Sequence, residues 1–164
     1  GTHTMGTMIG QEPDGSNKIG VAPGAKWIST RAFFLGETHD SYLLNAAEWV
    51  LAPKDENGVP HPEMAPDVVN NSWGGGPLNN DWFRPAVQAW RAVEIVPIFS
   101  VGNAGLFTDA SPGSASAPAN YPESIAVGAT DETDDLAWFS LRGPSERGDL
   151  KPDISAPGVA IRSS

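Results

Sequence analysis

Two stretches, DVVNNSWGGG (residues 67–76) and IVPIFSVGNAG (residues 95–105), decide the fold of this chain. Each begins with a short apolar run of the length of a buried strand and passes directly into a glycine-rich segment. Between them the sequence predicts a helix that runs roughly from residue 80 or 81 to residue 93. Pro85 is tolerated only in the first turn, which places the start near residues 81–84. A strand, a helix and a second strand at this spacing predict a βαβ unit with parallel strands.

The same pattern continues on both sides of this unit. AKWISTRAF (residues 25–33) is interpreted as a buried strand, and the apolar spacing after it predicts a helix from residue 40 or 41 that ends before Pro53. Residues 53–66 are expected to be a loop, and residues 125–130 a further strand. The fold class is therefore α/β, with a mostly parallel sheet flanked by helices. Because ligands bind at the carboxyl ends of such strands, both glycine-rich segments should lie at the binding edge.

Composition narrows the possible functions. The chain has 164 residues, of which 40% are hydrophobic, and this is sufficient for one domain. The net charge is −10 and no cluster of Lys and Arg occurs, so a nucleic acid is not an expected partner. No apolar run is long enough to predict a membrane span. The absence of cysteine excludes disulfides and thiol nucleophiles.

Asn103 is the first candidate for a functional side chain. It stands at the end of a predicted strand between Gly102 and an Ala-Gly pair, where its carboxamide could donate a hydrogen bond to an oxygen bound above the sheet. An asparagine at such a turn could equally be there because it tolerates a left-handed backbone. Local sequence leaves both interpretations open.

The segment 72–76 has a similar ambiguity. It could offer an edge to which an extended peptide adds as a further strand, or it could be a plain connection with Trp73 in the core. Among the other polar residues, the histidines lack metal-binding spacing, and the acidic run 131–135 is interpreted as a solvated turn rather than a calcium site. No Gly-x-Ser-x-Gly, Walker or GxGxxG motif occurs.

The order of several short phrases along the chain is more informative than any one of them. They are GTHTMGT (1–7), GVAP (20–23), NSWGG (71–75), GNAG (102–105), NYPE (120–123), VGAT (127–130), FS and GP (139–140 and 143–144), and KPDISAPG (151–158). Together these phrases span nearly the whole chain. Their wording and their order resemble the subtilisin family of serine proteases (peptidase S8).

This resemblance implies a three-layer subtilisin-like fold that is incomplete at both ends, with residues 1–164 forming the central part of a single peptidase domain. Asn103 would be the oxyanion-hole side chain of the catalytic site. The primary specificity pocket and the substrate strand would be lined by Ser72, Trp73, Gly74, Val101 and Gly102. His3 matches a second, non-catalytic histidine of the family.

The resemblance also places the catalytic Asp, His and Ser in motifs outside these 164 residues. We therefore expect the parent protein to be a secreted, extracellular serine endopeptidase that hydrolyses polypeptides, and the isolated chain to be inactive. Calcium is a cofactor in the family, but residues 8–18 depart from the family wording where a tight site would lie. No metal site is predicted, and the cofactor requirement is left unassigned.

Two alternatives belong to other functional classes. The chain could be a non-catalytic peptide-binding module that keeps a subtilisin-like pocket without the chemistry. It could also be a small hydrolase that uses Ser72, Ser100 or Ser140, although no histidine is positioned by sequence to act as the base.

Overall fold

A four-stranded parallel sheet organises the molecule. The computed structural model describes residues 1–105 and 109–163. The strands are β1 (Val68–Asn71), β2 (Val96–Ser100), β3 (Ile125–Thr130) and β4 (Ile154–Pro157), in the spatial order β1-β2-β3-β4. All three pairings are parallel, and Asn71 lies opposite Phe99 in the pairing of β1 with β2. The parallel α/β architecture predicted from the sequence is confirmed.

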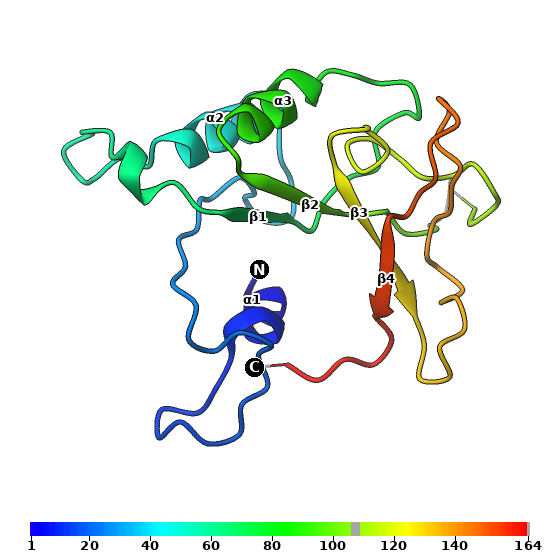
Figure 1. Cartoon of the computed structure of the whole chain (residues 1–164), viewed down its shortest axis with the longest axis horizontal. Coiled ribbons are helices and arrows are strands. Elements are labelled where there is room, and N and C mark those ends of the chain that lie inside the picture. Colours follow the sequence, from blue (N-terminus) through cyan, green and yellow to red (C-terminus); the bar gives the residue numbers. More distant parts are fainter. Residues whose placement is uncertain (106–108, 164) are drawn as a thin grey trace.

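Helices lie on both sides of this sheet. Helices α2 (Asp40–Leu51) and α3 (Arg84–Ala92) cover one face, and α1 (Thr2–Ile9) lies on the opposite side (Figure 1). A short 3₁₀ helix, η1 (Pro62–Met64), lies in the loop before β1. In the part of the chain that the structure describes, no helix has the length and apolarity needed to cross a membrane.

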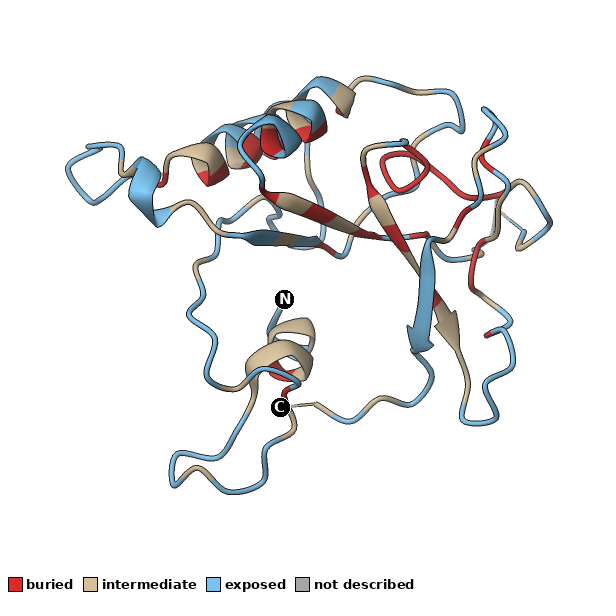
Figure 2. Ribbon diagram, viewed as in Figure 1, coloured by how far each residue is buried: buried red, intermediate tan, exposed pale blue. Residues whose placement is uncertain are grey.

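The hydrophobic core fills the layer between the sheet and helices α2 and α3. Residues Leu43, Ala47 and Val50 recur at helical spacing and form the buried stripe of α2. The indole nitrogen of Trp90 in α3 donates a hydrogen bond of 3.0 Å to the Ala47 carbonyl, which ties the two helices together. Burial is concentrated in this layer, in alternate residues of β2 and β3, and in residues 114–121, whereas β4 is exposed along its whole length (Figure 2).

Aromatic rings form the centre of this core. Phe83 is 1% exposed and contacts three other rings edge to face, with centroid distances of 5.0 Å to Trp73, 5.6 Å to Trp90 and 6.4 Å to Phe99. Rings at these separations gain attraction beyond their buried area. The cluster joins the loop after β1, helix α3 and strand β2 into one unit.

The strand predicted over residues 25–33 is wrong. The segment has no β-ladder, and the isolated bridge from Phe34 to Glu37 follows it as a tight turn. Its apolar residues alternate imperfectly and are largely in solvent, Trp27 being 58% exposed, so they supply no buried face for a strand. Helix α3 starts at Arg84, within the range that Pro85 set for its first turn. Strand β4 was not predicted, since its exposed residues carry no strand periodicity.

We predict that Phe83→Ala lowers the free energy of unfolding by about 3–5 kcal/mol, because the deletion leaves a cavity among rings that cannot collapse onto it. Phe34→Ala is the matched control; its ring is 58% exposed and lies 4.9 Å from the Arg31 guanidinium carbon, measured to the ring centroid. Its cost should stay below about 1 kcal/mol. Urea unfolding of the intact protein that contains this chain measures both, and equal losses would contradict a core centred on Phe83.

Candidate functional site

The two glycine-rich segments leave the sheet side by side. Strand β1 passes into residues 72–76 and β2 into residues 101–105, and these strands are neighbours in the sheet. Because they are parallel, both segments emerge at the same carboxyl edge. The pairing of β1 with β2 therefore brings the two glycine-rich segments together at the carboxyl edge of the sheet, as the sequence predicted.

Asn103 projects from this edge. Its side chain is exposed and has no hydrogen-bond partner among residues 1–105 and 109–163. Its backbone is fixed from both sides, since Ala104 N–H donates to the Phe139 carbonyl (2.6 Å) and Leu141 N–H to the Gly102 carbonyl (3.1 Å). A carboxamide on a backbone anchored in this way is a preorganised donor for an oxygen that binds above the edge.

The left-handed backbone belongs to Gly102, not to Asn103. Gly102 has φ = +106°, and Asn103 is not among the residues with positive φ. A Cβ on Gly102 would lie 2.7 Å from Leu141 Cδ1, a separation that forces a shift. The interpretation of Asn103 as a turn residue that tolerates left-handed geometry is therefore wrong. The glycine performs that role, and the Asn103 side chain is exposed.

Trp73 belongs to the core rather than to the exposed edge. Its ring packs against Phe83 at 5.0 Å and Phe99 at 5.5 Å, as the plain structural interpretation of this segment predicted. Its neighbours Ser72 and Gly74 are exposed, and the Ser72 hydroxyl accepts a hydrogen bond of 2.9 Å from the Asn70 amide. A ligand that runs along residues 72–74 can therefore meet their backbone and the Ser72 side chain, and the Trp73 ring is only partly exposed beside them.

A third segment, residues 114–120, runs across both glycine-rich segments, and sequence reasoning missed it. Ser116 N–H approaches the Val101 carbonyl at 3.5 Å, and Gly76 N–H donates to the Ala117 carbonyl at 3.3 Å. Asn120 is fully buried and donates to the Leu78 and Ala115 carbonyls at 2.7 and 3.2 Å. Because residues 114–120 are bonded to both glycine-rich segments, they fix the spacing between residues 72–76 and residues 101–105.

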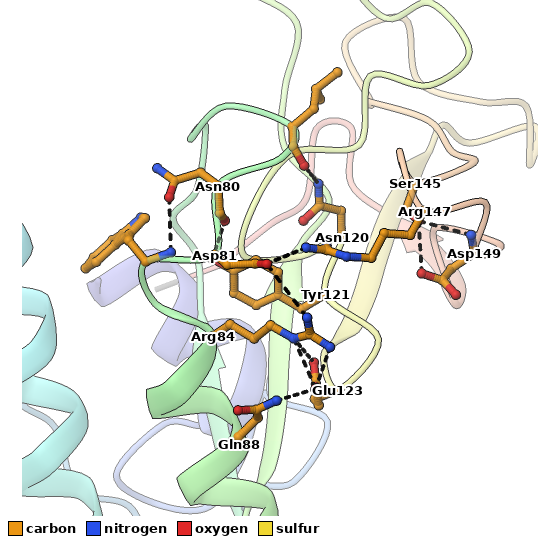
Figure 3. A network of polar contacts seen from close by, with 12 residues as sticks. Asn80, Asp81, Arg84, Gln88, Asn120, Tyr121, Glu123, Ser145, Arg147 and Asp149 are labelled. Carbon is orange, nitrogen blue, oxygen red and sulfur yellow. Dashed lines mark hydrogen bonds and ion pairs between the residues drawn. The ribbon is translucent and has the colours of Figure 1, made fainter.

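A polar network braces this third segment against α3 (Figure 3). Arg84 holds the Glu123 carboxylate through Nε and Nη2, at 3.0–3.1 Å, and Gln88 adds a bond of 2.9 Å. The Tyr121 hydroxyl donates to the Asn80 carbonyl at 2.8 Å. Arg147 reaches the carboxylate of Asp81, so the loop that contains Arg147 joins the same network.

Two opposing effects set the pKa of Glu123. Partial burial raises it, but the hydrogen bonds from Arg84 and Gln88 favour the charged form and bring the pKa below its ordinary value of 4.5. Glu123 is consequently ionised at neutral pH and holds Arg84 in place.

A cavity of about 570 Å³ is lined by α1 and by residues of all four strands. Its lining includes His3, Ser72, Ser100, Asn103 and Ser140. The His3 ring faces the Ile161 carbonyl at 3.0 Å, and the Ser140 hydroxyl accepts a bond from Ala129 N–H. Within the described ranges no serine hydroxyl is hydrogen-bonded to a histidine ring, so the cavity shows no serine–histidine pair of the kind that activates a nucleophile.

The acidic run 131–135 forms a self-contained turn. Asp131 Oδ1 accepts hydrogen bonds from Thr133 N–H, the Thr133 hydroxyl and Asp135 N–H, and these bonds lower the pKa of Asp131. In the residues that the structure describes, no group of three or more His, Cys, Asp or Glu side chains could hold a metal ion.

Comparison with known proteins identifies relatives along the whole chain. The sequence pattern described as "Subtilase family" matches residues 1–164. Bacillopeptidase F of Bacillus subtilis (strain 168) is 63% identical over 164 residues, which are 100% of this chain and 11% of that protein. Subtilisin E of the same strain is 30% identical over 165 residues, which are 100% of this chain and 38% of that protein. The chain thus spans well under half the length of these relatives.

A solved structure agrees in fold. A cold adapted subtilisin-like serine proteinase superposes with a TM-score of 0.74 at 24% identity, covering 99% of this chain and 50% of that one. This likeness confirms the three-layer α/β fold class predicted from the ordered phrases.

We predict that Arg84→Met lowers the free energy of unfolding at neutral pH, because the Glu123 carboxylate loses its main partner. The pKa of Glu123 is depressed in the folded state, so its stabilisation is complete above 4.5 and disappears as the pH falls through the lower folded pKa. The difference between parent and variant should therefore shrink below pH 4.5. Thermal unfolding from pH 7 to pH 3 checks this, with Arg91→Met as the exposed control on the same helix. A constant difference across that range would rule out the Glu123 pairing as its source.

Proposed function

The chain belongs to the subtilase family, and we propose that it is the substrate-binding and oxyanion-stabilising part of a subtilisin-like serine endopeptidase. In this proposal residues 1–164 are the central portion of a single peptidase domain. The catalytic Asp, His and Ser come from segments of the intact protein outside these residues, and the isolated chain does not hydrolyse peptides. The family match along the whole chain, with only part of each relative covered, supports this division.

One observation carries the proposal: the Asn103 carboxamide is exposed and unpaired within the described residues, on a backbone fixed at both neighbours. An exposed asparagine in a flexible loop would gain little by pointing at a ligand, because ordering it costs entropy on binding. Here the hydrogen bonds of Gly102 and Ala104 already fix the backbone, so only the Asn103 side chain has to be ordered on binding. The Asn103 amide is therefore ready to stabilise charge that develops beside it.

The proposed reaction is hydrolysis of a peptide bond held at this edge of the sheet. An extended polypeptide lies along residues 72–74 and 101–102, pairing with their backbone as an added strand. A serine hydroxyl attacks the scissile carbonyl carbon, a histidine takes the hydroxyl proton and returns it to the leaving amine, and an aspartate orients that histidine. The carbonyl oxygen becomes an oxyanion, and the Asn103 side-chain N–H donates to it. Water then releases the acyl group by the reverse sequence of proton transfers.

Partner and location follow from the same proposal. The substrate is a polypeptide bound mainly through its backbone, which suits an endopeptidase that accepts many sequences. The parent protein acts outside the cell as a secreted enzyme, by analogy with the family to which the chain belongs. No cofactor is assigned, since the described residues offer no metal cluster.

We predict that Asn103→Leu in the intact protein lowers kcat for a peptide substrate by about 10²–10³-fold with KM little changed. This loss of kcat is the one known for removal of the corresponding donor in subtilisin, a member of the same family. Leucine keeps the side-chain volume but removes the donor. Asn45→Leu, at an exposed position of α2, is the control and should leave kcat unchanged.

Steady-state kinetics separate the outcomes. A change confined to KM would mean that Asn103 binds the ground state rather than the oxyanion. An intact protein that binds extended peptides tightly without cleaving them would establish the peptide-binding module instead.

A further inference from the structure

We propose that protonated His61 holds the loop of residues 53–63 closed, and that loss of its proton opens residues 54–60 to cleavage by an endopeptidase. Cleavage is hydrolysis, in which water adds across one peptide bond of this segment to give a carboxylate and an amine. The inference goes beyond the proposed function and does not depend on it, because the loop enters β1 at its amino end, opposite the binding edge.

The loop is an exposed projection of the molecule. It leaves the end of α2 and extends away from the sheet before it returns to β1 (Figure 1). Residues 54–60 are exposed without interruption, whereas Pro53 at the base is buried. Exposed loop tips are preferred sites of proteolytic cleavage, once the segment can leave its folded conformation. The bonds that keep the loop closed therefore decide whether it is cut.

Asp55 organises the tip of the loop. Its N–H donates to the Val59 carbonyl, and its own carbonyl accepts from Gly58 N–H, both at 3.0 Å. One oxygen of its carboxylate, Oδ1, accepts from Asn57 N–H and Val59 N–H at 2.9 Å. All of these bonds lie within the loop, so the tip can open without breaking a bond of the sheet or a contact of the aromatic core.

The His61 ring links this tip to the far side of the loop. His61 N–H donates to the Pro53 carbonyl at 2.7 Å, which fixes the residue where the loop closes. Its ring lies between two carboxylates, with Nδ1 2.8 Å from Glu63 Oε1 and Nε2 3.6 Å from Asp55 Oδ2. A neutral imidazole has one N–H and turns a lone pair toward the second carboxylate, whereas an imidazolium donates on both sides. This geometry fits the protonated ring.

Other charged groups lie beyond ion-pair distance of the ring, among the residues that the structure describes. Lys54 and Glu56 are the remaining charged residues of the loop, and neither forms an ion pair with His61. The same holds for Glu48 in α2 and Asp67 before β1, in the parts of the chain that flank the loop. The charge of the ring is therefore balanced by its two carboxylate neighbours.

These contacts define the pH range in which the loop is closed. The hydrogen bond to Glu63 raises the pKa of His61 above its ordinary value of 6.5, desolvation opposes this rise, and Asp55 adds to it. Because the raised pKa belongs to the closed loop, the stabilisation is complete below pH 6.5 and is lost as the pH rises through the higher pKa. Both carboxylates stay ionised above their ordinary pKa values of 3.8 and 4.5.

Hydrogen exchange of the intact protein, followed by mass spectrometry, measures opening of the loop. Rates at about pH 5.5 and about pH 8.5 are corrected for the intrinsic pH dependence of exchange. We expect the amides of Asp55, Gly58 and Val59 to be about 2- to 5-fold less protected at the higher pH, the effect of one exposed ion pair. Strand β2 should show no such change.

Two variants identify the group that titrates. His61→Gln should be equally open at both pH values, because glutamine has no proton to lose in this range. His39→Gln is the matched control and should behave as the parent, since His39 is exposed and its ring only packs edge to face on Tyr42 at 5.3 Å. Equal protection at both pH values in the parent, or a pH dependence that survives in His61→Gln, would overturn the proposal.

Cleavage is measured with a glutamate-specific endopeptidase, which cuts after Glu56 at the tip of the loop. Its rate on the intact protein is divided by its rate on a free peptide of residues 53–63, which removes the pH dependence of the endopeptidase itself. We expect the normalised rate to rise about 2- to 5-fold from pH 5.5 to pH 8.5 in the parent and in His39→Gln, and to stay constant in His61→Gln. A loop that opens but is cut no faster would refute the cleavage site.

Discussion

Parallel hydrogen bonding between β1 and β2 is the constraint on which the binding edge depends. It places Asn71 opposite Phe99, so that residues 72–76 and 101–105 leave the sheet together. A shift of one residue in this register would exchange the inward and outward side chains of one strand. Trp73 would then lose its place against Phe83 and Phe99, so the aromatic core and the alignment of the edge stabilise each other.

Small residues then let three backbone segments meet. Gly102 adopts a positive φ beside Leu141, and residues 114–120 cross close to both glycine-rich segments. The Arg84–Glu123 pair ties the chain just after that crossing segment to α3. The backbone around Asn103, the proposed oxyanion donor, is consequently held by the hydrogen bonds of its two neighbours, Gly102 and Ala104.

Sequence periodicity predicted those parts of the fold whose residues are buried on a repeating pattern. Helix α2 and strands β1, β2 and β3 fall where predicted, because their apolar faces pack on the core. Periodicity predicted a strand over residues 25–33 that does not form, and it missed β4. Both segments are largely exposed, so their sequences carry no hydrophobic repeat. Asn103 could be named because glycines and a strand end surround it, whereas the crossing segment 114–120 is a uniform run of small residues. Only its hydrogen bonds to Val101 and Gly76 in three dimensions show that it lies against the binding edge.

The central claim is that this edge of the sheet holds the peptide whose carbonyl is attacked. A crystal structure of the intact protein with a bound peptide aldehyde tests it most directly. The account predicts that the former aldehyde oxygen lies about 2.7–3.1 Å from Asn103 Nδ2, with the peptide extended along residues 72–74 and 101–102. A peptide bound at another surface, or an Asn103 amide turned away from that oxygen, would contradict it.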